Sequence, residues 1–256
     1  MRLDVLALQR FYSSRLGDAA RRMIERRVGA IWPAAAGLDV LGLGYAIPYL
    51  GPYRENARRV VALMPAAQGV ERWPAAGPNL TALGEDARLP FLDSVFDRVL
   101  LIHALEEAEA PAALLREIWR IMAPEGRLLI VAANRAGLWA RADATPFGHG
   151  RPFSRHQLAA LLSDCLFEPM ATARALYAPP LDWPVVTALA DGAERAGELL
   201  APAFGGLIMM EAIKRLYADL GAAKRKVLLA SAPARPRSAS RENGCDGPAL
   251  SRQTTL

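Results

Sequence analysis

The sequence predicts an α/β fold in which a doubly wound, mainly parallel sheet is covered by helices on both faces. Apolar, strand-like runs alternate with helix-like segments along most of the chain. The first of these runs, residues 38–43, leads straight into a glycine-containing turn, as is typical of the start of a nucleotide-binding domain. The chain has 256 residues, of which 52% are hydrophobic and 22% charged, so it can bury one sizeable core.

Apolar runs bounded by turn residues mark the strands, and a periodicity of about 3.6 residues marks the helices. Pro111 suits the first turn of a helix, and Ser154 with Gln157 forms a capping box at the start of another. In chain order the expected elements are a basic amphipathic N-terminal helix, strand 38–43, helix 51–58, strand 59–64, a short strand 80–83, strand 95–102, helix 111–122, strand 127–133, helix 154–164, strand 166–177, helix 185–200 and strand 205–216.

Composition bears on the compartment and on metal binding. No apolar run reaches the roughly 18 residues that a membrane span requires, and the N-terminus lacks the apolar centre of a signal peptide. We therefore expect a cytoplasmic protein without a membrane span. Cys165 and Cys245 fall in a helix end and in a C-terminal tail, so neither a disulfide framework nor a metal site is predicted.

The positive charge of the chain lies at its C-terminal end. Residues 223–256 carry seven Lys and Arg against two acidic residues, which accounts for the whole net charge of +5. This segment is also rich in Pro, Ser and Gly, so we expect a disordered basic tail. The expected organisation is a helical lid over residues 1–34, one domain over 35–222 and the tail over 223–256. Because the body is neutral, nucleic acid is not an expected substrate.

Several segments together carry a family resemblance. Residues 84–105 read GEDARLPFLDSVFDRVLLIHAL, in which an acid precedes Ala-x-Leu-Pro-Phe, and a Pro124-Glu125-Gly126 turn precedes the strand at 127–133. Over roughly residues 36–135 the chain resembles the class I S-adenosylmethionine-dependent methyltransferases of the small-molecule, type 11-like group. The resemblance implies a Rossmann-like sheet with an antiparallel last strand, S-adenosylmethionine as cofactor, and transfer of a methyl group to a small molecule.

The expected cofactor site follows from where ligands bind in such sheets, beyond the carboxyl ends of the strands. The turn after strand 38–43 is expected to face the amino-acid part of the cofactor, and the resemblance implies that Asp86 accepts from the adenine amino group. Strand 59–64 lacks the acid that usually binds the ribose, and Gln68 is close enough in sequence to replace it. The complete set of predicted cofactor residues is Gly42, Gly44, Tyr45, Ala46, Met64, Gln68, Asp86, Ala87 and Ile102.

Candidate catalytic groups follow the later strands. His103, at the end of strand 95–102, is the first candidate for a base or for orienting the methyl acceptor, although a packed structural histidine is an equally good interpretation. His149, between two glycines, is the second. The predicted acceptor contacts are Tyr12, Asn134, Arg135 and Trp139.

Departures from the family pattern leave a second hypothesis open. Val40 stands where an acid is common, Ala46 replaces a glycine, and the ribose-binding acid is missing. These departures favour a catalytically inactive methyltransferase-like domain that binds a protein partner, whereas the Asp86 segment and the histidine-bearing loops favour an enzyme. A nicotinamide oxidoreductase ranks third, because Ile47 breaks the G-x-G-x-x-G fingerprint.

Overall fold

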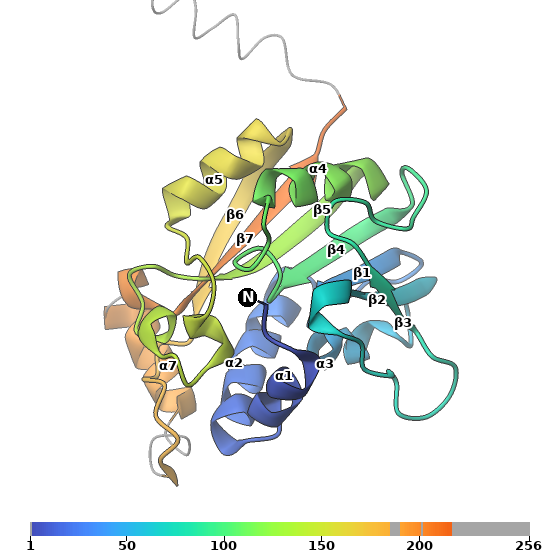
Figure 1. Cartoon of the computed structure of the whole chain (residues 1–256). Helices are drawn as coiled ribbons and strands as arrows, with labels where there is room; N and C mark the ends of the chain where they lie inside the picture. The colour runs from blue at the N-terminus through green and yellow to red at the C-terminus, as the bar shows by residue number, and fades with distance from the viewer. Residues whose placement is uncertain (1, 185–189, 201, 217–256) are drawn as a thin grey trace, which may run out of the picture. The chain divides into compact units, whose positions relative to one another are not determined.

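A seven-stranded sheet forms the centre of the protein, as the computed structural model shows (Figure 1). The structure describes residues 2–184, 190–200 and 202–216. The first five strands along the chain pair in parallel, and the last strand runs antiparallel between its two neighbours. The sheet order is β3 (Thr81–Gly84), β2 (Arg59–Pro65), β1 (Asp39–Gly44), β4 (Phe96–Ile102), β5 (Met122–Ala133), β7 (Leu207–Lys214) and β6 (Phe167–Ala175).

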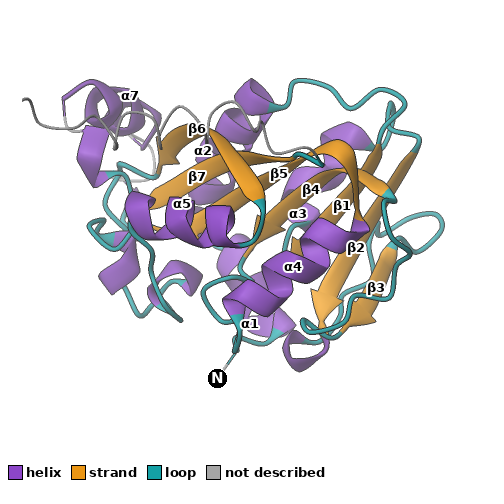
Figure 2. Cartoon of the chain, turned by 90° about the horizontal axis from the view of Figure 1, so that it is seen from above, coloured by secondary structure: helices purple, strands orange, loops and turns teal. Residues whose placement is uncertain are grey.

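Helices cover both faces of this sheet (Figure 2). Two hydrophobic clusters separate the layers, because successive strand residues point to opposite faces. Met23 and Ile24 belong to one cluster, and Leu114 and Leu158 belong to the other. The helices are α1 (Val5–Tyr12), α2 (Arg15–Ile31), α3 (Ile47–Leu50), α4 (Pro111–Ile121), α5 (Arg155–Asp164) and α7 (Ala190–Leu200). No helix in the described part of the chain is long and apolar enough to cross a membrane.

The predicted fold class is confirmed, including the antiparallel last strand. The predicted short strand at 80–83 is β3, and Pro111 starts α4. The capping box at Ser154 and Gln157 has both of its hydrogen bonds. Part of the predicted helix 185–200, and the tail with Cys245, lie outside the described residues.

Two local predictions are wrong. Residues 51–58 do not form a helix: α3 ends at Leu50 and only a 3₁₀ turn, Gly51–Tyr53, follows. Gly51 and Pro52 account for this, because glycine lowers helix propensity and proline has no N–H to donate. The predicted turn at 124–126 lies within β5, where Glu125 has a φ of 58° and the pairing with β4 shifts register.

The parallel strands all finish at one end of the sheet, which we call the carboxyl edge. Gly44 pairs with Ile102 at the ends of β1 and β4, and Pro65 pairs with Gly84 at the ends of β2 and β3. The N-terminal segment and α1 lie against this edge (Figure 1). Ligands of open parallel sheets bind at such an edge, so these contacts define the candidate site.

Candidate cofactor and acceptor site

The turn after β1 is packed tightly by the protein itself. Gly44 has a φ of 86°, and a Cβ there would clash with the carbonyl oxygen of Ile102. A Cβ on Gly42 would lie 2.6 Å from Leu50 Cδ1 and 2.7 Å from the Cβ of Ala46. Both glycines are therefore required by the contact of β1 with β4 and α3. Ala46, which stands where the family pattern has a third glycine, is fully buried at this contact, so its methyl group is part of the packing there.

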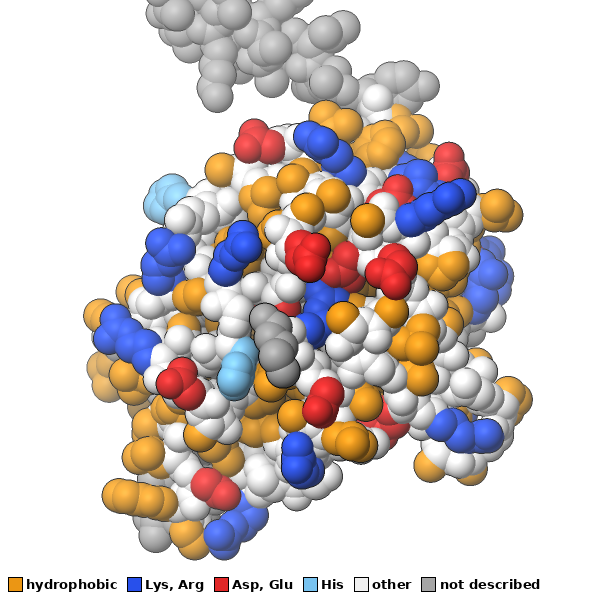
Figure 3. Space-filling view, viewed as in Figure 1, with side chains coloured by type: hydrophobic (Ala, Val, Ile, Leu, Met, Phe, Trp, Pro, Cys, Tyr) orange, Lys and Arg blue, Asp and Glu red, His pale blue; other side chains and the backbone are white. Residues whose placement is uncertain are grey.

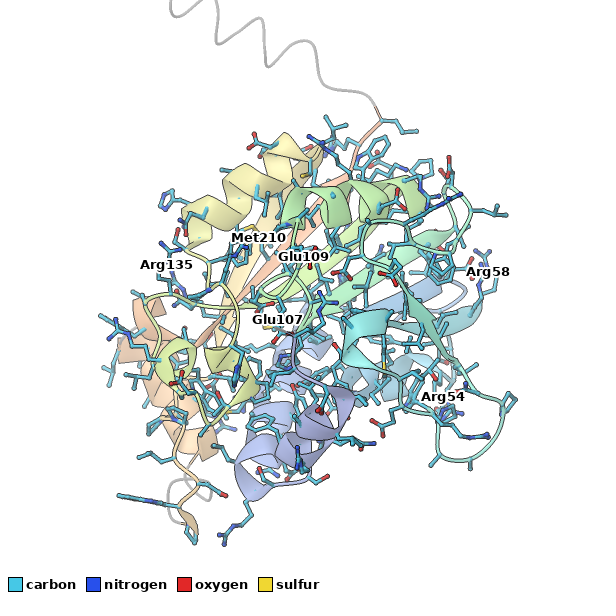
Figure 4. All side chains as sticks on the ribbon, in the orientation of Figure 1. Arg54, Arg58, Glu107, Glu109, Arg135 and Met210 are labelled. Carbon is cyan, nitrogen blue, oxygen red and sulfur yellow. The ribbon has the colours of Figure 1, made fainter. Side chains whose placement is uncertain are left out.

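Asp86, the predicted adenine acceptor, is bound by the N-terminal segment. The Arg2 guanidinium donates to both carboxylate oxygens, with Nη1–Oδ1 and Nη2–Oδ2 distances of 3.1 and 2.6 Å. Nη2 also lies 3.3 Å from the carbonyl oxygen of Ala104. The Leu3 amide donates to the Glu107 carboxylate at 3.2 Å, and Figure 4 shows Glu107 beside the start of the chain. Asp86 therefore lies at the carboxyl edge, as predicted, but has an internal partner.

Gln68 is buried without a hydrogen-bond partner. Its side chain is 2% exposed, and neither the amide oxygen nor the amide nitrogen is bonded within the described part of the chain. Leaving such groups unpaired costs about 1–3 kcal/mol, so native proteins rarely do so without a reason. Gln68 follows the end of β2, next to fully buried Met64. An amide in this position fits the hydroxyl groups of a ribose.

His103 lies in an aromatic cluster under α1. Its Nε2 is 2.7 Å from the Tyr12 hydroxyl, which in turn accepts from Tyr49 at 2.9 Å. The Tyr12 ring stacks on Tyr45 with centroids 5.6 Å apart, and Phe147 lies 4.7 Å from the imidazole. Since the Tyr12 hydroxyl has one hydrogen, we assign it as the donor to Nε2, which leaves the imidazole proton on Nδ1.

Burial decides the protonation of this cluster. It lowers the pKa of His103 to about 3 and holds the pKa of Tyr12 well above its usual value. The imidazole is therefore neutral at physiological pH. A general base works best when its pKa lies near the working pH, so His103 in this environment accepts a hydrogen bond more readily than a proton.

Glu106 is a site residue that the sequence prediction missed. Its side chain is 6% exposed, one carboxyl oxygen accepts from the Ala133 amide at 2.8 Å, and the other has no partner among the described residues. Burial raises the pKa of Glu106 to about 7. In the sequence, only its position three residues after His103 could have pointed to Glu106. At the ends of β4 and β5, this carboxyl group is better poised than His103 to take up a proton.

The predicted acceptor contacts separate into buried and exposed groups. The Asn134 amide donates to the carbonyl oxygen of Gly205 at 2.6 Å, and the Trp139 indole donates to that of Ala178 at 2.7 Å. Both side chains are buried and tie loops together. Arg135 is exposed and points outward in Figure 4. His149 is half-buried, with Nε2 3.0 Å from the carbonyl oxygen of Asp143. Burial raises the pKa of nearby Glu107, and His149 is among the groups that oppose this rise.

Two surface hollows flank the covered carboxyl edge. One, of about 520 Å³, lies at the end of α1, where Tyr45 donates to Glu71 at 2.8 Å. The other, of about 610 Å³, is lined by residues 87–92 with Glu117 and Arg120. The first includes Tyr12 and Tyr45 of the aromatic cluster in its wall and so adjoins His103. Among the described residues, no cluster of His, Cys, Asp or Glu could hold a metal ion.

Residues 38–130 match the family described as a methyltransferase domain. With the strand order above, this match decides the classification. By this match and by its fold, the chain is similar to the class I methyltransferases. The resemblance seen in the sequence is thus confirmed, and the family implies S-adenosylmethionine as the cofactor. Asp86, Gln68 and the β1 turn fit that cofactor in kind, since they offer a carboxylate, an unpaired amide and a close backbone approach.

Solved structures share the fold of the methyltransferase domain. An S-adenosylmethionine-dependent methyltransferase of Thermotoga maritima matches with a TM-score of 0.55 and 16% identity, over 81% of this chain and 94% of its own. An S-adenosylmethionine-dependent methyltransferase from Mesorhizobium loti matches with a TM-score of 0.54 and 15% identity, over 79% of this chain and 99% of its own. The [4+2]-cyclase SpnF matches with a TM-score of 0.55 and 20% identity, over 78% of this chain and 83% of its own. No curated protein matches the sequence. A cyclase among these structures means that the reaction has to be argued from the site.

Proposed function

We propose that this methyltransferase domain transfers a methyl group from S-adenosylmethionine to a small molecule. The observation that carries the proposal is the unpaired, buried amide of Gln68 at the end of β2. It replaces the missing ribose-binding acid with a group that has a hydrogen-bond donor and an acceptor to spare. Asp86 accepts from the adenine amino group, and residues 42–46 approach the amino-acid part of the cofactor. Met64, Ala87 and Ile102 supply apolar contact.

When bound, the cofactor supplies a sulfonium methyl group, whose bond to sulfur breaks as the acceptor atom forms its new bond to the methyl carbon. This chain orients the acceptor through His103, whose neutral imidazole hydrogen-bonds without taking a proton. Glu106 receives the proton that the acceptor loses, because its pKa lies near 7. His149 remains the alternative proton acceptor.

Size and charge support a small acceptor over nucleic acid. The hollow of about 520 Å³ beside the aromatic cluster suits a small molecule. In the view of Figure 3, acidic and basic side chains are interspersed, and no broad basic patch covers the described surface on this face. Phosphate backbones are bound by clusters of Lys and Arg, so this face does not favour a nucleic acid.

Gln68→Leu tests the cofactor role of the amide. The substitution keeps the volume of the side chain but removes both polar atoms. Calorimetric titration of S-adenosylhomocysteine into the full chain is expected to show roughly ten-fold weaker binding, because the ribose loses its partner. The free protein is expected to be about 1 kcal/mol more stable, since an unpaired buried amide has been removed.

Glu109→Ala serves as the control, because Glu109 is exposed and is not among the predicted cofactor residues, although Figure 4 shows it near Glu107. It should leave the affinity unchanged. No binding of S-adenosylhomocysteine to folded wild-type protein or to any variant would reject the enzyme and favour the inactive, partner-binding domain. Equal affinity of wild type and Gln68→Leu would reject the role of Gln68.

A further inference from the structure

The N-terminal arm, which we define as residues 2–12, contacts residues that we assign to cofactor and acceptor binding. The Arg2 side chain is 6% exposed and bonds both oxygens of Asp86, so about half of the acceptor positions of this carboxylate are already taken. The Tyr12 ring stacks on Tyr45 in the β1 turn and its hydroxyl is bonded to His103. The arm thus spans from the adenine position to the acceptor position.

The same arm approaches the segment that contains Gln68. A Cβ on Gly69, the neighbour of Gln68, would lie 3.4 Å from Val5 Cγ1 of α1. Gln68 itself is 2% exposed, and no described residue hydrogen-bonds its amide. A ribose can therefore reach this amide only after the packing that buries it has opened.

Packing shows which part of the N-terminal region is able to move. In α1 only Leu8 is buried, and Leu6 is 61% exposed. In α2 one face is buried along its length: Leu16, Gly17, Ala19, Ala20, Met23, Ile24 and Val28. Since burial of apolar area is the main source of stability, α2 is anchored to the body along one whole face, whereas α1 is anchored less firmly, because Leu8 is buried but Val5, Phe11 and Tyr12 are only partly buried against the core.

We propose that the N-terminal arm is an intramolecular competitor of S-adenosylmethionine and regulates access to the cofactor site. This inference rests on the proposed function. Arg2 must leave Asp86, and Tyr12 must leave the aromatic cluster, before the cofactor binds. A closed arm lowers the apparent affinity by the fraction of molecules that are closed, without changing the site itself.

Arg2→Ala tests the competition. Titration of S-adenosylhomocysteine into the full chain is expected to give a Kd roughly ten-fold lower than that of wild type, because a doubly hydrogen-bonded ion pair no longer holds the arm closed. Arg155→Ala is the charge-matched control, since Arg155 is exposed at the start of α5, away from the site. Circular dichroism verifies that each variant is folded.

The double variant Arg2→Ala with Asp86→Ala separates the two roles of the carboxylate. It should bind roughly ten-fold more weakly than Arg2→Ala alone, because only the adenine contact is then lost. Hydrogen exchange of the α1 amides gives an independent result: exchange should speed up when S-adenosylhomocysteine binds to the wild type.

The outcomes distinguish failure of this inference from failure of the proposed function. Equal or weaker binding by Arg2→Ala, or slower exchange of α1 in the complex, would overturn the competition but leave the cofactor site intact. No binding by any folded variant would overturn both, because the arm would then have nothing to exclude.

Discussion

Glu106 and His103 show how burial sets the chemistry of single residues in this protein. Both lie at the end of β4 and both are 6% exposed, yet their pKa values move in opposite directions because burial disfavours the charged form of each. The result is a neutral imidazole and a carboxyl group that titrates near neutral pH. The sequence pattern predicted His103 as the candidate base. The burial of the two side chains instead favours Glu106 as the group that takes up a proton near neutral pH.

Glu106→Gln tests this assignment through stability. The pKa of Glu106 is raised from its usual value, near 4.5, to about 7, so the folded state holds the proton more tightly than the unfolded state. Relative to Glu106→Gln, wild type should lose up to about 3 kcal/mol of unfolding free energy as pH rises from about 4.5 through 7. Urea denaturation of both proteins between pH 4.5 and 8 measures the difference.

The His103 contribution cancels in this comparison, because both proteins contain the same imidazole. Glutamine also preserves the acceptor for the Ala133 amide. Parallel stability curves for the two proteins across this pH range would mean that Glu106 is not a buried, weakly acidic group.

At the scale of elements, the turn between β1 and α3 is shaped by packing. Gly44 combines a positive φ with direct contact against β4, and Gly42 is covered by α3. The sequence interpretation assigned these glycines to close approach of a ligand. The structure adds that the packing of the protein itself requires both glycines.

Gly44→Ala should therefore destabilise the protein whether or not a cofactor is present. The expected loss is about 3 kcal/mol or more, from the unfavourable φ and the clash with Ile102. Gly51→Ala is the control, because a Cβ at Gly51 meets nothing within 4 Å and its φ is ordinary. Thermal denaturation of the two variants decides the matter, and equal midpoints would contradict this packing argument.

At the scale of the whole molecule, the sheet was predictable from the sequence, but the side-chain contacts of the N-terminal segment with it were not. Apolar runs such as residues 40–43 of β1 and 99–102 of β4 are the pattern expected of buried parallel strands. Gln68 was predicted from its position after the second strand, and Asp86 from the family resemblance of the segment that contains it. Arg2 was missed as a partner of Asp86, since 84 residues separate them and no local pattern links an N-terminal arginine to a loop carboxylate.

Together these observations describe a methyltransferase domain whose carboxyl edge is assembled but covered. Asp86, Gln68 and the β1 turn lie along that edge, while Arg2 is bonded to Asp86 and Tyr12 to His103. Such an arrangement makes opening of the arm part of the binding equilibrium.

The most direct test of this account is a crystal structure of the full chain grown with S-adenosylhomocysteine. The account predicts the adenine amino group at the Asp86 carboxylate, the ribose hydroxyls at the Gln68 amide, and Arg2 displaced from Asp86. S-adenosylhomocysteine bound elsewhere, or its absence at millimolar concentration with Arg2 still on Asp86, would contradict it.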